Sequence, residues 1–239
     1  MIDAPPPALP PPHFRTVRSF VRRSGRVTVA QQRALKGCWP KYGLDFHPQP
    51  IDLDVLFGRM APRTMEIGFG NGEHLLARAV AEPQRDFLGV EVHRSGVGQL
   101  MNAAAEAGIS NLRVACHDAI EVLQAQIAPQ ALDEVQILFP DPWPKARHHK
   151  RRLIQPVFIE LLATRLATGG RLLLATDWLP YAEQIRLVID DCMHFEALAS
   201  GDADEGAQPT AQRRAQTRFE RRGLRLGHEV SEFCYRRRP

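Results

Sequence analysis

Fourteen consecutive residues of this 239-residue chain combine the side chains that point most directly to chemistry. They read Phe139-Pro-Asp-Pro-Trp-Pro-Lys-Ala-Arg-His-His-Lys-Arg-Arg152. Asp141 is fixed between two prolines, the aromatic Trp143 follows, and a dense basic run comes next. A rigid carboxylate, a stacking ring and a phosphate-attracting segment therefore lie together, as a planar base within a polyanionic strand would require.

A glycine-rich segment upstream, Glu66-Ile-Gly-Phe-Gly-Asn-Gly72, marks a second candidate site. It lies where an apolar strand pattern meets a helical one, and glycines there let the backbone adopt positive φ and approach a ligand. The spacing is G-x-G-x-G, which differs from the G-x-G-x-x-G of a dinucleotide pyrophosphate site. On its own, the run is equally typical of a tight turn without a ligand.

Two further acids lie at or just past the ends of the next two predicted strands. Glu91 lies 25 residues after Glu66, and a carboxylate at this position can accept hydrogen bonds from both ribose hydroxyls. Asp118 could accept from an adenine amino group, and it fits equally well as the N-cap of a helix that starts at Ala119. The recurrence of acids at successive strand ends favours an adenosine-type ligand.

Strand and helix patterns alternate along the segments that must position these residues. Strands are predicted at 63–67, 86–92, 112–115, 135–139 and 171–176, with a last one at 233–235. Helices are predicted at 74–81, 95–107, from about 119, at 153–167 and at 181–192, with Gly169 and Gly170 ending the fourth. This order predicts an α/β fold: a mainly parallel twisted sheet with helices on both faces and a last antiparallel strand.

Charge is segregated along the chain. Residues 1–47 carry a net charge of +6, residues 145–152 carry +5 and residues 213–239 carry +6, whereas the whole chain carries only +4. The remaining residues therefore form an acidic body with a net charge of −13. Three basic segments on an acidic body favour a localised polyanion site, although any single run could equally be a solvated face.

Composition excludes several other classes of protein. The four cysteines form no C-x-x-C pair, which argues against a zinc site or a disulfide scaffold and favours a reducing cytosol. His148 and His149 have no third ligand at a suitable spacing, so we expect no metal. The chain has no run of 18 apolar residues, and residues 1–13 form a proline-rich tail that we expect to be disordered. We therefore predict neither a membrane span nor a signal peptide, and a cytoplasmic location.

The glycine-rich segment and the following acids resemble those of the class I S-adenosylmethionine-dependent methyltransferases. The run from Phe139 to Arg152 more closely resembles the bacterial tRNA (guanine-N7)-methyltransferases. Three further pieces agree in order with this family: Arg18-Ser-Phe-Val-Arg-Arg23, Thr176-Asp-Trp178 and Thr217-Arg-Phe-Glu220. The resemblance spans residues 15 to 239, which leaves only the proline-rich tail outside it.

The resemblance implies a Rossmann-like enzyme that transfers a methyl group from S-adenosyl-L-methionine to N7 of guanine-46 in the variable loop of tRNA. S-adenosyl-L-homocysteine and 7-methylguanosine would be the products. The basic composition of the N-terminal region separately predicts an arm at 14–58 that faces the substrate and packs partly on the body. A methyltransferase domain at 59–239 with a basic C-terminal segment would follow it. We expect tRNA as the partner, with no membrane and no obligatory protein partner, and a monomer or homodimer.

The resemblance also assigns roles to individual residues. The cofactor residues are Glu66, Gly68, Gly70, Gly72, Glu91, Asp118 and Asp141, of which Asp141 is also catalytic. The substrate residues are Lys145, Asp177, Thr217, Arg218, Phe219 and Glu220. The RNA-interacting residues are Arg147, His148, His149, Lys150, Arg151 and Arg152.

The chemistry of guanine N7 limits what these residues must do. N7 has an in-plane lone pair and carries no proton at neutral pH, so attack on a sulfonium methyl needs orientation more than a base. We therefore expect Asp141 to position guanine and to offset developing charge. Trp143 could stack on the base, but a core tryptophan behind a rigid turn is the favoured interpretation. Asp177 could cap the following helix as well as contact guanine.

Three other functions remain open from the sequence. A methyltransferase acting on a small molecule or a protein would keep its turnover without the basic arm. A non-catalytic tRNA-binding module would fail to bind S-adenosylmethionine. A dehydrogenase would bind a nicotinamide cofactor, although the glycine spacing argues against it.

Overall fold

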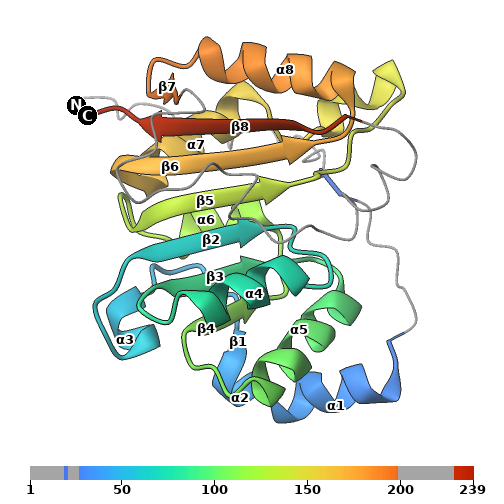
Figure 1. The fold of residues 1–239 in the computed structure, drawn as a ribbon, viewed down its shortest axis with the longest axis vertical. Helices are drawn as coiled ribbons and strands as arrows, with labels where there is room; N and C mark the ends of the chain where they lie inside the picture. Colours follow the sequence, from blue (N-terminus) through green and yellow to red (C-terminus); the bar gives the residue numbers. More distant parts are fainter. Residues whose placement is uncertain (1–18, 21–26, 199–228) are drawn as a thin grey trace, which may run out of the picture.

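A single mixed sheet organises the chain in the computed structural model, which describes residues 19–20, 27–198 and 229–239. Its strands lie in the order β1-β4-β3-β2-β5-β6-β8-β7 (Figure 1). All pairings from β1 to β6 are parallel, and β8 is antiparallel to both of its neighbours. The strands are β1 Gly43–Leu44, β2 Arg63–Ile67, β3 Asp86–Val90, β4 Leu112–Ala115, β5 Leu132–Leu138, β6 Leu166–Thr176, β7 Phe195–Ala197 and β8 Ser231–Arg237.

Helices cover both faces of this sheet. In Figure 1, α4 and α5 lie in front of the sheet, whereas α6 and α7 lie behind it. The helices are α1 Val29–Gly37, α2 Trp39–Tyr42, α3 Leu53–Phe57, α4 Glu73–Ala81, α5 Arg94–Glu106, α6 Ala119–Ala125, α7 Pro156–Arg165 and α8 Leu179–Asp190, with a 3-10 helix η1 at Ala146–Arg151. The predicted parallel sheet, covered on both faces and ending in an antiparallel strand, is confirmed.

Side-chain alternation along the strands divides the interior into two hydrophobic cores. Met65 and Ile67 of β2 belong to the core formed with α6, α7 and α8. Phe87 of β3 belongs instead to the core formed with α1, α4 and α5. Because successive strand residues point to opposite faces, Glu66 points to the α4 side, where it contacts His74 of that helix.

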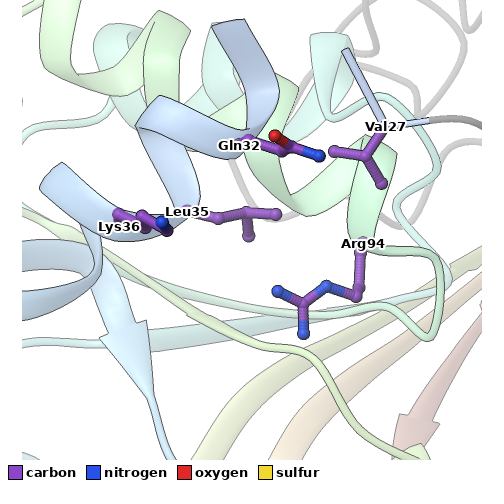
Figure 2. Close-up of a pocket in the computed structure, with 5 residues that line it drawn as sticks. All are labelled: Val27, Gln32, Leu35, Lys36 and Arg94. Atoms are coloured by element: carbon purple, nitrogen blue, oxygen red, sulfur yellow. The ribbon is translucent and has the colours of Figure 1, made fainter. Parts of the chain in front are cut away.

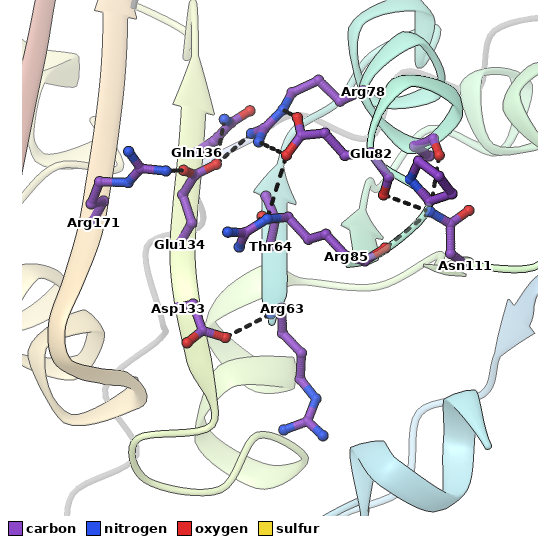
Figure 3. Close-up of polar contacts among 12 residues, drawn as sticks. Arg63, Thr64, Arg78, Glu82, Arg85, Asn111, Asp133, Glu134, Gln136 and Arg171 are labelled. Atoms are coloured by element: carbon purple, nitrogen blue, oxygen red, sulfur yellow. Dashed lines mark hydrogen bonds and ion pairs between the residues drawn. The ribbon is translucent and has the colours of Figure 1, made fainter. Parts of the chain in front are cut away.

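A buried ionic network crosses the α4 side of the sheet (Figure 3). The Glu134 carboxylate of β5 forms ion pairs with Arg78 of α4 and with Arg171 of β6, the second at 2.8 Å. Burial alone would raise the pKa of Glu134, but Arg78 and Arg171 outweigh that effect and hold the pKa below its ordinary value. This network therefore fixes α4, and with it the glycine loop that precedes α4, to the central strands.

The region predicted as a basic arm contains more regular structure than the sequence indicated. It includes α1, α2, β1 and α3. A capping box starts α1, in which Thr28 and Gln31 exchange hydrogen bonds of 2.9 and 3.2 Å. Tyr42 at the end of α2 is buried, and its hydroxyl donates to the carbonyl of Ile109 at 2.8 Å. Residues 29–57 are thus built into the body of the protein.

Gly169 and Gly170 do not end the fourth predicted helix. The helix ends at Arg165, and both glycines lie inside β6. The pairing of β5 with β6 jumps there from Leu132↔Leu166 to Glu134↔Arg171. The glycines occupy this irregularity, where the positive φ of Gly169, 79°, suits a residue without a Cβ.

Candidate active site

The candidate cofactor loop joins β2 to α4 at the carboxyl ends of the parallel strands, where ligands bind in open α/β sheets. Gly68, Gly70 and Gly72 have φ values of 74°, 61° and 79°, so all three adopt the left-handed backbone predicted for them. A Cβ on Gly68 would meet nothing within 4 Å, which leaves open space beside this residue. On the other side the loop is tightly packed, because a Cβ on Gly96 of α5 would lie 1.9 Å from the Gly70 carbonyl oxygen.

Glu91 holds the shape of this loop from the end of β3. Its Oε2 accepts a hydrogen bond from the Gly70 amide at 2.9 Å. Its Oε1 accepts from the amides of Val92 and His93 at 2.6 and 2.9 Å. The carboxylate is buried, and each of its oxygens can accept more than one hydrogen bond. Glu91 thus places an anionic acceptor beside the glycine loop.

Glu66 forms a buried pair with His74 beneath the same loop. Oε2 of Glu66 lies 2.8 Å from Nδ1 of His74, and the side chain of each residue is 3 % exposed. The other ring nitrogen of His74, Nε2, is buried without a hydrogen-bond partner among the described residues. This pair links the end of β2 to the first turn of α4.

Asp118 caps helix α6. Its Oδ1 accepts from the Ile120 amide at 3.0 Å, and its backbone is extended as an N-cap requires. The sequence left the cap and the ligand contact equally open, and the structure establishes the cap. Since Asp118 follows β4, it also lies at the strand edge that carries Glu66 and Glu91.

The loop after β5 presents Asp141 in an unusual backbone. Phe139 and Trp143 have φ values of 53° and 44°, a region that residues other than glycine rarely adopt. The Phe139 amide donates to the carbonyl of Ala175 at 2.8 Å, so the loop starts on the sheet itself. Asp141 lies between these two residues, with its side chain exposed. Non-glycine residues in such conformations concentrate at functional sites.

Trp143 lies outside both hydrophobic cores, so the interpretation of this residue as a core tryptophan is wrong. Its side chain is half-buried, and its indole N–H donates to the carbonyl of Ser19 at 3.0 Å. The guanidinium of Arg151 lies 4.9 Å from the ring centroid, and His148 contacts the ring edge-on. Trp143 therefore joins the basic run to a residue of the N-terminal region.

The basic run forms the 3-10 helix η1 with Lys145 as its N-cap. The side chains of Lys145, Arg147 and Lys150 are exposed, as a polyanion site requires, and those of His148, His149 and Arg151 are half-buried. Burial and the cations of Arg147 and Arg151 lower the pKa of His148 below its ordinary value. A lowered pKa favours the neutral form of the His148 imidazole.

Arg152, which the resemblance assigns to RNA contact, is buried, whereas its neighbours in the basic run are exposed or half-buried. Its side chain is 3 % exposed. Its guanidinium donates hydrogen bonds within the protein, the shortest to Gln184 Oε1 at 2.7 Å and to the Pro142 carbonyl at 2.8 Å. The guanidinium is therefore directed into the protein, unlike the exposed side chains of Lys145, Arg147 and Lys150.

Asp177 follows β6, at the strand edge that also carries Asp141. The sequence left open whether Asp177 caps α8, and the N-cap of that helix is Trp178, which makes no side-chain cap bond. The side chain of Asp177 is half-buried. The four predicted substrate residues Thr217, Arg218, Phe219 and Glu220 lie outside the described residues, as do Arg18 and Arg22–Arg23.

A hollow of about 350 Å³ that the sequence did not reveal lies between α1 and the start of α5 (Figure 2). It is lined by Val27, Gln32, Leu35, Lys36 and Arg94. In the described part of the chain, no cluster of three His, Cys, Asp or Glu side chains could hold a metal ion. No described helix is long and apolar enough to cross a membrane.

The sheet order and the five acids at its carboxyl edge define a Rossmann-like class I methyltransferase fold. Two solved structures support the fold: the 16S rRNA methyltransferase KamB, with a TM-score of 0.52 and 14% identity over 91% of this chain and 97% of that one, and the antibiotic-resistance methyltransferase Kmr, with a TM-score of 0.53 and 16% identity over 82% and 98%. A family model described as "Putative methyltransferase" matches residues 60–233. The chain belongs to the tRNA (guanine-N7)-methyltransferase family.

Curated relatives carry this assignment over most of the chain. The tRNA (guanine-N(7)-)-methyltransferase of Halorhodospira halophila is 54% identical over 94% of this chain and 96% of its own length. The enzymes of the same name from Sodalis glossinidius and Leifsonia xyli are 51% and 52% identical over 93% of this chain, and the match covers 92% and 96% of their lengths. The resemblance predicted from the sequence motifs is confirmed.

Proposed function

We propose that this chain transfers a methyl group from S-adenosyl-L-methionine to N7 of guanine-46 in tRNA. The observation that carries the proposal is the end-to-end similarity to relatives named for guanine-N7 methylation of tRNA. The placement of Glu66, Glu91, Asp118, Asp141 and Asp177 at one edge of the sheet supports it.

The chemistry of the loop residues fits an adenosine-type methyl donor. The open space beside Gly68 leaves room for a ligand against the backbone. Glu91 would accept the ribose hydroxyls, Asp118 would lie near the adenine, and Glu66 with the glycines would lie near the methionine part. When bound, S-adenosyl-L-methionine supplies an electrophilic methyl group on a positively charged sulfur.

Asp141 would act on the acceptor by orientation and charge. Its exposed carboxylate can accept hydrogen bonds from the amino and N1–H edge of guanine. As N7 gains a methyl group the ring becomes cationic, and a carboxylate fixed nearby stabilises that charge. Because N7 bears no proton, Asp141 does not have to remove one.

Exposed cations beside this carboxylate would bind the tRNA backbone. Lys145, Arg147 and Lys150 project from η1, with Arg151 and the two histidines on the same short helix. Phosphate contacts of this kind release counterions, so tRNA affinity should fall steeply as salt rises. The full binding surface would include Asp177 and the segment around Thr217–Glu220.

The test is methyl transfer from labelled S-adenosyl-L-methionine to tRNA by the purified chain, with nucleoside analysis for 7-methylguanosine. A tRNA with adenine in place of guanine-46 should accept no label. A tRNA with 7-deazaguanine at the same position offers the same base edge without the N7 lone pair, so it should bind and remain unmethylated. Label in another nucleoside, or equal label in the adenine-46 tRNA, would overturn the proposal.

A further inference from the structure

The side chain of Arg152 is surrounded by hydrogen-bond acceptors from three segments. Nε donates to the carbonyl of Pro142 at 2.8 Å. Nη1 donates to Oε1 of Gln184 at 2.7 Å and to the carbonyl of Pro180 at 3.3 Å. Nη2 lies 3.1 Å from Nε2 of His149. All three nitrogens of the guanidinium are therefore committed to protein acceptors.

An aromatic ring supports this buried cation. The guanidinium carbon of Arg152 lies 4.9 Å from the ring centroid of Tyr181, which is fully buried. Burial raises the pKa of Tyr181 to about 12, so the phenol is neutral, and its oxygen accepts from the Ile154 amide at 3.1 Å. Burial lowers the pKa of Arg152, but a guanidinium stays charged at neutral pH. The cation is thus stabilised by the ring face and by directed acceptors.

These contacts bridge the two loops that carry the acceptor-site acids. Pro142 directly follows Asp141, whereas Pro180 and Gln184 lie in the first turns of α8, just after Asp177. Gln184 also donates from Nε2 to the carbonyl of Ile154 at 2.9 Å, which fixes its orientation. One side chain therefore connects the loop after β5 to the helix after β6.

The loop after β5 needs such a connection. Its backbone adopts left-handed conformations at Phe139 and Trp143, each of which costs about 1–3 kcal/mol unless the surroundings impose it. Pro142, between Asp141 and Trp143, has no amide hydrogen, so its carbonyl is the polar backbone group through which the loop can be held there.

We propose that Arg152 is a positioning residue that sets the distance and orientation of Asp141 relative to Asp177, and that it binds no tRNA phosphate. The proposal rests on the acceptor-site roles proposed above for these two acids. It separates Arg152 from its exposed neighbours in the basic run, which would bind phosphates.

The experiment compares Arg152→Gln and Arg152→Lys with the wild type in methyl transfer and in tRNA binding over a series of salt concentrations. We expect kcat to fall roughly 10- to 100-fold, because displacement of a catalytic group by about 1 Å costs about that much. The Kd for tRNA should change less than about 2-fold, with an unchanged slope of log affinity against log salt. A lysine ammonium keeps the positive charge but lacks the planar set of donors of a guanidinium. The kcat of Arg152→Lys should therefore lie between that of the wild type and that of Arg152→Gln.

Lys150→Gln is the reference variant that shows how the salt dependence of tRNA binding changes when one phosphate contact is lost. Loss of one phosphate contact reduces the slope by about 0.7 to 0.9, and Lys150→Gln should show that reduction. If Arg152→Gln shows the same reduction, or keeps kcat within about 2-fold of the wild type, the positioning role is wrong. Gln184→Leu removes an acceptor of Arg152 without altering the basic run itself, and it should lower kcat in the same direction without changing the slope.

Folding and the proposed function are controlled separately. Thermal unfolding and S-adenosylmethionine affinity show whether Arg152→Gln retains its fold. If it does not, the kcat and the salt slope of Gln184→Leu test the positioning role instead. If the wild-type chain forms no 7-methylguanosine, the proposed function fails. The salt slopes of Arg152→Gln and Lys150→Gln still decide whether Arg152 contacts phosphates.

Discussion

Replacing Gly96 with alanine should displace the candidate cofactor loop. A Cβ at position 96 would lie 1.9 Å from the carbonyl oxygen of Gly70 and 2.9 Å from its carbonyl carbon. Non-bonded carbon and oxygen atoms do not approach within about 3 Å, so α5 or the loop must move by about 1 Å. The Gly70 amide donates to Glu91 across 2.9 Å, and such a movement would disturb this bond.

The magnitude follows from this geometry. Overpacking of a tight contact costs about 1–3 kcal/mol of stability. A displacement of about 1 Å in a binding loop reduces ligand affinity or turnover by up to about 100-fold. We therefore expect Gly96→Ala to lower the free energy of unfolding by about 2 kcal/mol and to weaken S-adenosylmethionine binding at least about 10-fold. Denaturant unfolding and titration calorimetry measure the two effects.

Two glycines provide matched controls. A Cβ on Gly98 of the same helix would lie 2.8 Å from the Gln31 carbonyl oxygen of α1, so Gly98→Ala overpacks α5 on the side away from the glycine loop. Gly37→Ala meets nothing within 4 Å and should leave stability within about 1 kcal/mol of the wild type. If Gly96→Ala loses stability as Gly98→Ala does but binds the cofactor with wild-type affinity, the reasoning about the loop is refuted.

Three further predictions follow from the charged groups. Asp141→Asn should lower kcat by about 100-fold with little change in tRNA affinity, if charge stabilisation dominates; near-wild-type turnover in single-turnover assays would contradict this. Glu134→Gln should destabilise the fold by about 3–5 kcal/mol at pH 7, where the carboxylate is paired. Since its pKa is depressed in the folded state, that contribution is present above the ordinary pKa and is lost as pH falls through the folded value, so the unfolding curves of the two proteins should converge in acid. His148 has a lowered pKa, so tRNA affinity should rise as pH drops below about 6.5, and His148→Asn should flatten that rise in filter-binding titrations at constant salt.

The sequence was sufficient where local patterns decide the structure. Apolar runs at 63–67 and 112–115 coincide with β2 and β4, because short runs bounded by turn residues and followed by helical periodicity have few alternatives in a βαβ chain. The glycines at 68, 70 and 72 likewise indicated where the backbone could adopt positive φ, because they lack a Cβ. In a parallel sheet, residues that end successive strands meet at one edge, so the clustering of the acids followed from their positions in the chain.

The sequence was insufficient where a residue's role depends on distant partners. Gly169 and Gly170 were expected to end a helix, but pairing with β5 places them in β6. The sequence left open whether Asp177 caps α8, and the structure places Trp178 at the N-cap instead. Helices α1 to α3 lacked a clear pattern because they are short and contact the body through a few buried residues such as Tyr42.

The basic run that follows Asp141 contains both kinds of property, those set by the sequence and those set only by the tertiary structure. Its composition alone established a cationic segment next to a rigid carboxylate, because formal charge and proline geometry are properties of the chain. Only the tertiary structure separated the exposed Lys150 from the buried Arg152. The acceptors and the ring that stabilise the Arg152 guanidinium include Gln184 and Tyr181, which lie about thirty residues away in sequence. Burial of a charge depends on such partners, and only folding brings them together.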